Sequence, residues 1–223
     1  MGGLKKETLQ FLKDLKKNNN REWFTKYKSR YENAYADWLG FTGELITGLS
    51  KIDKKIAAAK FQPKDCTFRI YRDIRFSKDK TPYKINFASE FSTKQGQWDV
   101  PGYYVHINTA DGFMGGGAYM LQPMQLQAMR EELSLNGNKF KKIIADKNFK
   151  KYFTLEGVKL VNVPRGFEKN DPMAEYLKHK HMLAMHKVAE KDILSHGFAQ
   201  HCLEAFKAMQ PFLHYIERPV TNP

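Results

Sequence analysis

The run Cys66-Thr-Phe-Arg-Ile-Tyr-Arg-Asp-Ile-Arg-Phe76 marks the point where the hydrophobic pattern of the chain changes from a helical period to a period of two. Apolar and polar residues alternate along this run, except at Arg72. Such alternation predicts a strand with one buried face and one charged face. The turn-like residues 77–82 follow, and residues 84–91 alternate again, so we expect a β-hairpin.

The pattern continues beyond this hairpin toward the C-terminus. Residues 103–108 alternate, Asp111-Gly112 is typical of a turn, and the glycine-rich residues 113–119 follow. Four consecutive strands indicate an antiparallel meander. Residues 182–188 predict a fifth strand.

Helical patterns lie on both sides of the predicted sheet. Residues 8–15 predict a first helix, and a long helix is expected from the cap Asn20 to Leu49. Pro63 is expected to end this helical region, and Pro211 to bend or break a C-terminal helix that Ser195 caps. Shorter helices are expected at residues 123–135, 140–145 and 171–178. The buried stripe of the long helix is predicted to be Phe24, Tyr27, Tyr31, Ala34, Trp38, Phe41, Leu45 and Leu49.

These patterns predict an α+β fold in which an antiparallel meander sheet of four to five strands packs against N- and C-terminal helices. With 223 residues, 42% of them hydrophobic and 13% aromatic, the chain can bury a core and is not a disordered protein. We expect a single domain spanning residues 1–223, because no linker or repeat interrupts the pattern.

The location is predicted to be cytoplasmic. Every apolar stretch is shorter than the roughly 20 residues that cross a bilayer, and the N-terminus has no apolar signal-peptide region. The two cysteines, Cys66 and Cys202, do not form a disulfide framework or a Cys-x-x-Cys motif. We therefore expect reduced thiols and no membrane partner.

The positive charge of the chain is unevenly distributed. Residues 1–100 contribute +9 of the net +13, and lysines outnumber arginines by 29 to 8. Three of the eight arginines, Arg69, Arg72 and Arg75, nevertheless lie within seven positions. Because a guanidinium presents a planar fork to carboxylate or phosphate, this clustering favours an anion site.

The period of two places Arg69 and Arg75 on one face of the predicted sheet together with Lys84, Tyr104 and His106, and this face would be cationic. Positive neighbours would depress the pKa of His106 and keep it neutral as a possible base. The alternative is a surface on which arginines and aspartates pair with each other, without a ligand. The anion-binding candidates are Arg69, Arg72, Arg75, Lys80, Lys84 and Tyr104, and the catalytic candidates are His106 and Tyr83.

Other motifs carry weaker signals. Ser77 and Lys80 have Ser-x-x-Lys spacing, but Thr81-Pro82 follows at once and favours a turn. The histidines at 179, 181 and 186 lack the further ligands that a metal needs, and Gly115-Gly-Gly117 fits no nucleotide-binding fingerprint. We expect neither a metal nor a cofactor.

Several segments together resemble a known family. They are Asn19–Phe24, Phe68–Lys84, Gly102–His106, Gly115–Gly117 and Pro164–Phe167, and they are similar to the bacterial domain of unknown function 2461 over nearly the whole chain. The resemblance implies a compact bacterial α+β protein and implies no mechanism. Where the family pattern has a histidine before a proline, this chain has Asp171, so that position is given no ligand or catalytic role.

Three functions remain open on these grounds. The first is recognition of a phosphorylated or carboxylated small molecule, by an enzyme or by a binding protein. The second is nucleic-acid binding, which a sequence pI near 9.5 and aromatic residues interleaved with arginine favour. The third is a structural or partner-binding domain without catalysis. The sequence does not decide the oligomeric state.

Overall fold

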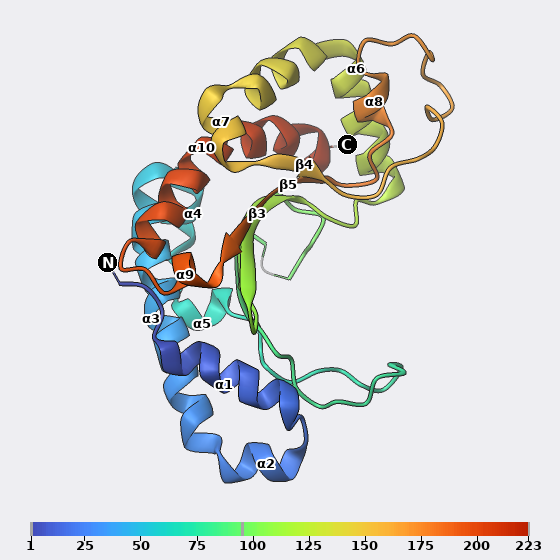
Figure 1. The fold of residues 1–223 in the computed structure, drawn as a ribbon. Helices are drawn as coiled ribbons and strands as arrows, with labels where there is room; N and C mark the ends of the chain where they lie inside the picture. Colours follow the sequence, from blue (N-terminus) through green and yellow to red (C-terminus); the bar gives the residue numbers. More distant parts are fainter. Residues whose placement is uncertain (1, 95, 223) are drawn as a thin grey trace. The chain divides into compact units, whose positions relative to one another are not determined.

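The computed structural model describes residues 2–94 and 96–222 of the chain, and within them five strands form one antiparallel sheet. The order across the sheet is β1-β2-β3-β5-β4, and helices precede and follow the β1–β3 meander (Figure 1). The α+β prediction is therefore confirmed. The strands are β1 (Phe87–Phe91), β2 (Gly102–Ile107), β3 (Asp111–Ala118), β4 (Thr154–Glu156) and β5 (Met182–Ala189).

The contacts of the chain fall into two units. Unit 1 contains residues 1–91, 104–114 and 187–204, and unit 2 contains residues 92–103, 115–186 and 205–223. Strands β2, β3 and β5 each contribute residues to both units. The expectation of a single domain stays a prediction.

The helices of unit 1 follow the amphipathic patterns of the sequence, with one break. The side chain of Asn20 accepts a hydrogen bond from the backbone N–H of Trp23 at 2.9 Å, as expected of a helix cap. The predicted long helix is divided at Tyr27, where φ is −110° and ψ is 28°. The helices are α1 (Lys6–Lys17), α2 (Arg21–Lys26), α3 (Lys28–Ile52), α4 (Lys54–Ala59), α5 (Pro63–Cys66) and α9 (Glu190–Ile193).

From Ala34 to Leu49 the α3 stripe forms the core of unit 1, as predicted, whereas Tyr27 and Tyr31 of the predicted stripe are only half-buried. Trp38 is fully buried, and its indole N–H donates to the Ser89 hydroxyl at 3.0 Å. Phe41 stacks on Phe198 with 5.0 Å between the ring centroids. Pro63, in contrast, does not end the helical region, because it occupies the first turn of α5, where its missing N–H costs nothing.

Residues 68–84, which we call the arm, replace the expected first strand. The arm leaves α5 and returns to β1 (Figure 1), and its two limbs meet at an isolated bridge between Tyr71 and Tyr83. The prediction of a strand from Cys66 to Phe76 is wrong for a local reason. The carboxylates of Asp73 and Asp79 accept hydrogen bonds from nearby backbone N–H groups, which would otherwise donate to a neighbouring strand. Pro82 has no backbone N–H to donate to a strand.

The helices of unit 2 enclose an aromatic core. Phe149 lies 5.6 Å from Phe212, and Phe140 lies 6.1 Å from Phe212, measured between ring centroids. One helix joins the predicted segments 123–135 and 140–145, with non-helical dihedrals at Asn136. The helices are α6 (Pro123–Ala145), α7 (Lys147–Tyr152), α8 (Ala174–Leu177) and the part of α10 (Phe198–Thr221) from Ala205 onward.

The C-terminal helix α10 does not stop at Pro211, so the expected break is absent. A proline inside a helix costs about 3 kcal/mol or more. The buried residues on either side, which include Met209, Phe212 and Ile216, offset that cost. No helix among the described residues combines the length and apolar character needed to cross a membrane.

Candidate anion-binding site

A cavity of about 460 Å³ lies at the base of the arm in unit 1. Three cationic side chains line it: Lys16 from the end of α1, and Arg72 and Lys84 from the arm. Asp79 contributes a carboxylate to the same lining. The described wall of this cavity is therefore cationic.

Asn19 fixes the arm base to the end of α1. Its side-chain amide donates to the carbonyl oxygen of Tyr83 at 2.9 Å, and its amide oxygen accepts from the N–H of Tyr83 at 3.1 Å. The Tyr83 ring stacks on Phe24 of α2, with 4.0 Å between centroids and 13° between planes. Polar and aromatic contacts thus hold the same arm residue in place.

Arg72 is fixed by partners within the arm. Its guanidinium pairs with Asp79 and donates to the Thr81 hydroxyl. The backbone N–H of Thr81 and the Arg72 guanidinium lower the pKa of Asp79 to about 2. Asp79 is consequently ionised at neutral pH and compensates part of the Arg72 charge.

Lys84 has no such compensation. Its side chain is partly buried, and no carboxylate among residues 2–94 and 96–222 lies within ion-pair distance of its ammonium group. Its nitrogen lies 5.5 Å from the centroid of the Phe68 ring. Burial lowers the pKa of Lys84, and the neighbouring Arg69 lowers it further. The ammonium group therefore lies in an environment that disfavours a positive charge.

Two polar residues of β2 lie near Lys84. The Tyr104 hydroxyl and Nδ1 of His106 are hydrogen-bonded at 3.3 Å, and His106 stacks on Phe113 with 4.7 Å between centroids. Burial lowers the pKa of His106 to about 4; Asp111 opposes this shift and Lys84 adds to it.

The protonation states of this pair are set by burial. At neutral pH the imidazole is neutral, as the sequence predicts, but burial is the larger cause and positive charge the smaller. Burial also raises the pKa of Tyr104 to about 12, with a smaller effect of Glu90. The pair thus offers a neutral imidazole and a protonated phenol beside a cation, which suits hydrogen bonding to a ligand or acceptance of a proton.

Of the predicted site residues, Arg72, Tyr83 and Lys84 line this cavity, whereas Tyr104, His106 and the remaining predicted cations do not. Arg75 pairs with Asp73 at 2.7 Å, and the Lys80 ammonium donates to the carbonyl oxygen of Ile74 at 3.0 Å. Both cations are exposed, as is Arg69. Neither Arg75 nor Lys80 lines the described cavity, because the arm is not a strand and does not present alternate residues to one sheet face.

Lys16 and Asn19 were not foreseen as site residues. They lie in the polar run that follows the apolar pattern of α1, which indicates a helix end and gives no sign of a distant partner. The signal that could identify Asn19 is the capacity of a primary amide to bond both polar groups of one peptide unit. That capacity does not indicate which residue is the partner of Asn19, and the actual partner, Tyr83, is 64 positions away in the sequence.

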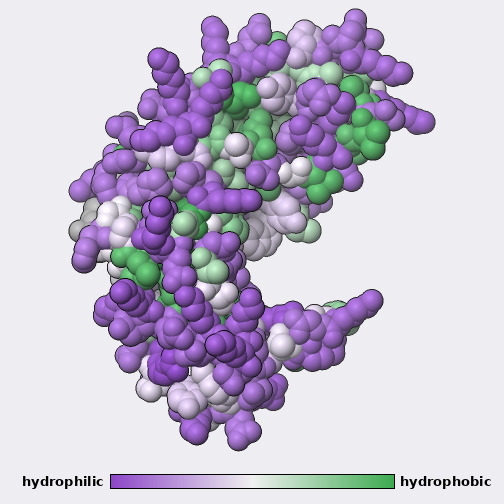
Figure 2. All heavy atoms as spheres, viewed as in Figure 1, coloured by the Kyte–Doolittle hydropathy of each residue, from purple (hydrophilic) through white to green (hydrophobic). Residues whose placement is uncertain are grey.

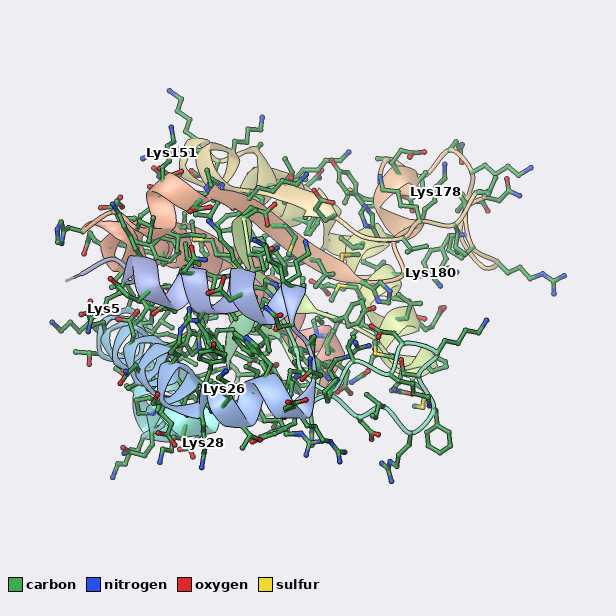
Figure 3. All side chains as sticks on the ribbon, turned by 60° about the horizontal axis from the view of Figure 1, so that its bottom comes forward. Lys5, Lys26, Lys28, Lys151, Lys178 and Lys180 are labelled. Atoms are coloured by element: carbon green, nitrogen blue, oxygen red, sulfur yellow. The ribbon has the colours of Figure 1, made fainter. Side chains whose placement is uncertain are left out.

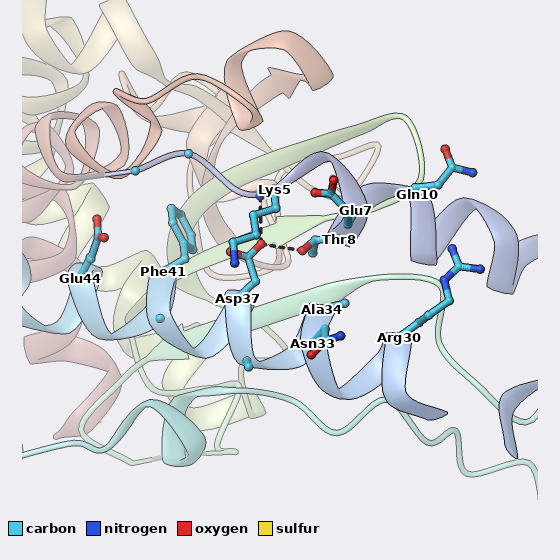
Figure 4. Close-up of a pocket in the computed structure, with 14 residues that line it drawn as sticks. Lys5, Glu7, Thr8, Gln10, Arg30, Asn33, Ala34, Asp37, Phe41 and Glu44 are labelled. Carbon is cyan, nitrogen blue, oxygen red and sulfur yellow. Dashed lines mark hydrogen bonds between the residues drawn. The ribbon is translucent and has the colours of Figure 1, made fainter. Parts of the chain in front are cut away.

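A larger groove of about 880 Å³ lies between α1 and α3 (Figure 4). Its lining mixes acidic and basic side chains, and several of them hold the helices together. Asp37 accepts from the backbone N–H of Lys5 at 3.0 Å and from the Thr8 hydroxyl at 2.5 Å. Arg30 pairs with Asp14 at 2.6 Å. This groove lacks the cationic excess of the arm cavity.

The clustered histidines have separate partners. Nδ1 of His186 donates to the carbonyl oxygen of Tyr152 at 2.5 Å, whereas Nδ1 of His181 accepts from the N–H of Met120 at 3.1 Å. Within the described ranges, no group of three or more His, Cys, Asp or Glu side chains could hold a metal ion. The expectation that the protein needs no metal stays a prediction.

Comparison with known families identifies the chain. It belongs to the family described as "Conserved hypothetical protein (DUF2461)", whose model matches residues 7–215. The resemblance seen in the sequence is therefore confirmed. A search of curated proteins gives no match.

Proposed function

Since the family description assigns no activity, we propose from the site itself that this protein binds a small phosphorylated or carboxylated molecule in the cavity at the arm base. The observation that carries the proposal is the partly buried ammonium group of Lys84, which has no carboxylate partner among the described residues. Burying a cation without a counter-charge costs free energy. An anionic ligand would supply that charge.

The surroundings of Lys84 support this proposal. Lys16 and Arg72 add positive charge to the cavity wall, and Asp79 offsets part of it. A volume of about 460 Å³ suits a small molecule better than a macromolecule. His106 and Tyr104 do not line the cavity, but His106 lies close enough to Lys84 to sense its charge. Both an enzyme and a binding protein remain forms of the proposal.

Thermal unfolding in inorganic phosphate and in citrate, each matched in ionic strength with sodium chloride, tests this site. We expect a saturable rise in Tm for the wild type, because a ligand at 100 times its Kd stabilises the folded state by about 2.7 kcal/mol. Lys84→Gln should abolish the rise, and Lys16→Gln should reduce it. Both substitutions remove a positive charge from the cavity wall.

Lys26→Gln is the matched control, because Lys26 is an exposed lysine on α2 that does not line the cavity. Its Tm should rise with phosphate as in the wild type. A rise of equal size in all variants would indicate general salt stabilisation and contradict the proposal. The absence of any saturable rise in the wild type would contradict it as well.

A cytoplasmic location is part of the same proposal. Cys66 and Cys202 are both buried and do not form a disulfide. Burial raises the pKa of the Cys66 thiol to about 12 and raises that of Cys202 as well, so both thiols are protonated and unreactive at neutral pH. This state suits a reducing compartment.

A further inference from the structure

The tip of the arm, residues 73–80, presents an aromatic ring to solvent. Phe76 is 95% exposed, the highest exposure among the large apolar side chains described. The guanidinium carbon of Arg75 lies 5.9 Å from the centroid of the Phe76 ring. We propose that this tip binds single-stranded nucleic acid, with Phe76 stacking on a base and the neighbouring cations contacting phosphates.

The charge of the tip matches this partner. Residues 73–80 contain three cations, Arg75, Lys78 and Lys80, and two aspartates. Lys78 and Lys80 are both exposed at the tip, close in sequence to Phe76. Hydrophilic residues cover most of the arm surface in view (Figure 2). Cations around an exposed ring are the combination that sequence-tolerant single-strand binding uses.

Local hydrogen bonds define the shape of the tip. Arg75 makes two hydrogen bonds to the Asp73 carboxylate, at 3.0 and 2.7 Å. The Lys80 ammonium donates to the carbonyl oxygen of Ile74 at 3.0 Å and so closes the turn. A preformed loop loses less conformational entropy on binding than a mobile one. These hydrogen bonds restrict the tip segment that carries the exposed Phe76 ring.

A membrane surface fits this tip less well. Insertion into a bilayer is driven by buried apolar area, and Phe76 is the single large apolar side chain that the tip fully exposes among the described residues. One ring and several cations suffice for stacking on a base.

The lysines labelled in Figure 3 do not lie beside a ring as exposed as that of Phe76. Lys5, Lys26 and Lys28 belong to successive segments of unit 1, and Lys151 and Lys180 belong to unit 2 (Figure 3). All five are exposed. Scattered lysines can strengthen non-specific attraction. Lys26 lies over the ring of Tyr27, but that ring is only half-exposed, unlike Phe76. The inference therefore rests on Phe76, Arg75, Lys78 and Lys80, none of which lines the proposed small-anion cavity.

Fluorescence anisotropy with labelled 20-nucleotide oligo(dT) and oligo(U) in about 50 mM salt tests the inference. We expect the wild type to bind one or both strands. Phe76→Ala should weaken binding about 5- to 150-fold, the range expected for loss of one stacked base. Leu135→Ala is the matched control, since Leu135 is 82% exposed on α6 and should leave the affinity unchanged.

The double variant Lys78→Gln/Lys80→Gln should reduce the slope of log affinity against log salt. The stacking contribution of Phe76 to its affinity should remain. Lys84→Gln should bind the oligonucleotides as the wild type does, so failure of the cavity proposal would be distinguishable from failure of this one. Equal binding by Phe76→Ala and wild type would overturn the inference. No oligonucleotide binding, or binding to phosphatidylserine vesicles alone, would also overturn it.

Discussion

His106 links the chemistry of the candidate site to the stability of the fold. Its pKa falls from an ordinary value of 6.5 to about 4 in the folded state. The unfolded chain therefore binds a proton at a higher pH than the folded one, and stability is lost as the pH falls from about 6.5 to 4. We expect this residue alone to cost about 3 kcal/mol of unfolding free energy over that interval. Denaturant titrations at pH 7 and pH 4 measure the loss.

The variant His106→Gln isolates that contribution. Its unfolding free energy should fall less than that of the wild type between the two pH values. A remaining fall is expected, because burial also lowers the pKa of His179 to about 4. If the variant and the wild type lose equal stability, His106 is not the buried neutral group that the structure indicates.

Two of the three glycines in helix α3, Gly40 and Gly48, have different surroundings. A Cβ atom at Gly40 would meet no atom within 4 Å, whereas one at Gly48 would lie 2.2 Å from a methyl carbon of Leu203. Gly40→Ala should therefore stabilise the protein by up to about 1 kcal/mol through helix propensity. Gly48→Ala should destabilise it by about 1 kcal/mol or more, because the buried Leu203 must move.

Equilibrium denaturation of both variants provides the measurement, and each is the control for the other because the substitution and the helix are the same. Stabilisation by Gly48→Ala would mean that Leu203 adopts another rotamer without cost. Destabilisation by Gly40→Ala would mean that its open surroundings are occupied in solution.

The comparison of expected and observed elements shows where sequence patterns are informative. The α3 stripe around Trp38 and strand β2 follow the expected periods, because a helix or strand with one apolar face has one favourable way to bury it. Strand β1, in contrast, is buried on both faces, which its alternating sequence does not indicate. The short strand β4, Thr154–Glu156, has no pattern long enough to be recognised. Its position depends on antiparallel pairing with β5, which is distant in the sequence.

The candidate site was predictable to a similar extent. The density of arginines pointed to the arm, and two of the predicted residues, Arg72 and Lys84, line one cavity there. Their role in anion binding stays a prediction. The distribution of the remaining cations depends on local bonds of Asp73 and Asp79, which bend the arm away from the expected strand. A pattern of alternating apolar and polar residues does not show whether a side chain will take the backbone hydrogen bonds that a strand needs.

At the scale of the whole molecule, the two units share continuous elements. Strands β2, β3 and β5 and helix α10 each have residues in both. We therefore expect one cooperative unfolding transition, as a single domain requires. Trp38→Ala in unit 1 and Phe140→Ala in unit 2 should each cost about 3 to 5 kcal/mol, because both side chains are fully buried.

Hydrogen exchange followed by mass spectrometry separates one transition from two. In a single cooperative domain, either variant lowers the protection of slowly exchanging amides in both units. Loss of protection confined to the unit that carries the substitution would show that the units unfold independently. Trp38→Phe, which retains most of the buried apolar surface, should lose less stability than Trp38→Ala.

The twofold bond between Asn19 and Tyr83 has a consequence for the chemical ageing of this protein. Hydrolysis of the Asn19 amide to a carboxylate would keep the acceptor for the Tyr83 N–H but would replace the group that donates to the Tyr83 carbonyl oxygen. Two oxygens would then face each other at the arm base, and a negative charge would appear beside the cationic cavity. A single deamidation would thus loosen the arm and, at the same time, offset part of the positive charge of its proposed binding site.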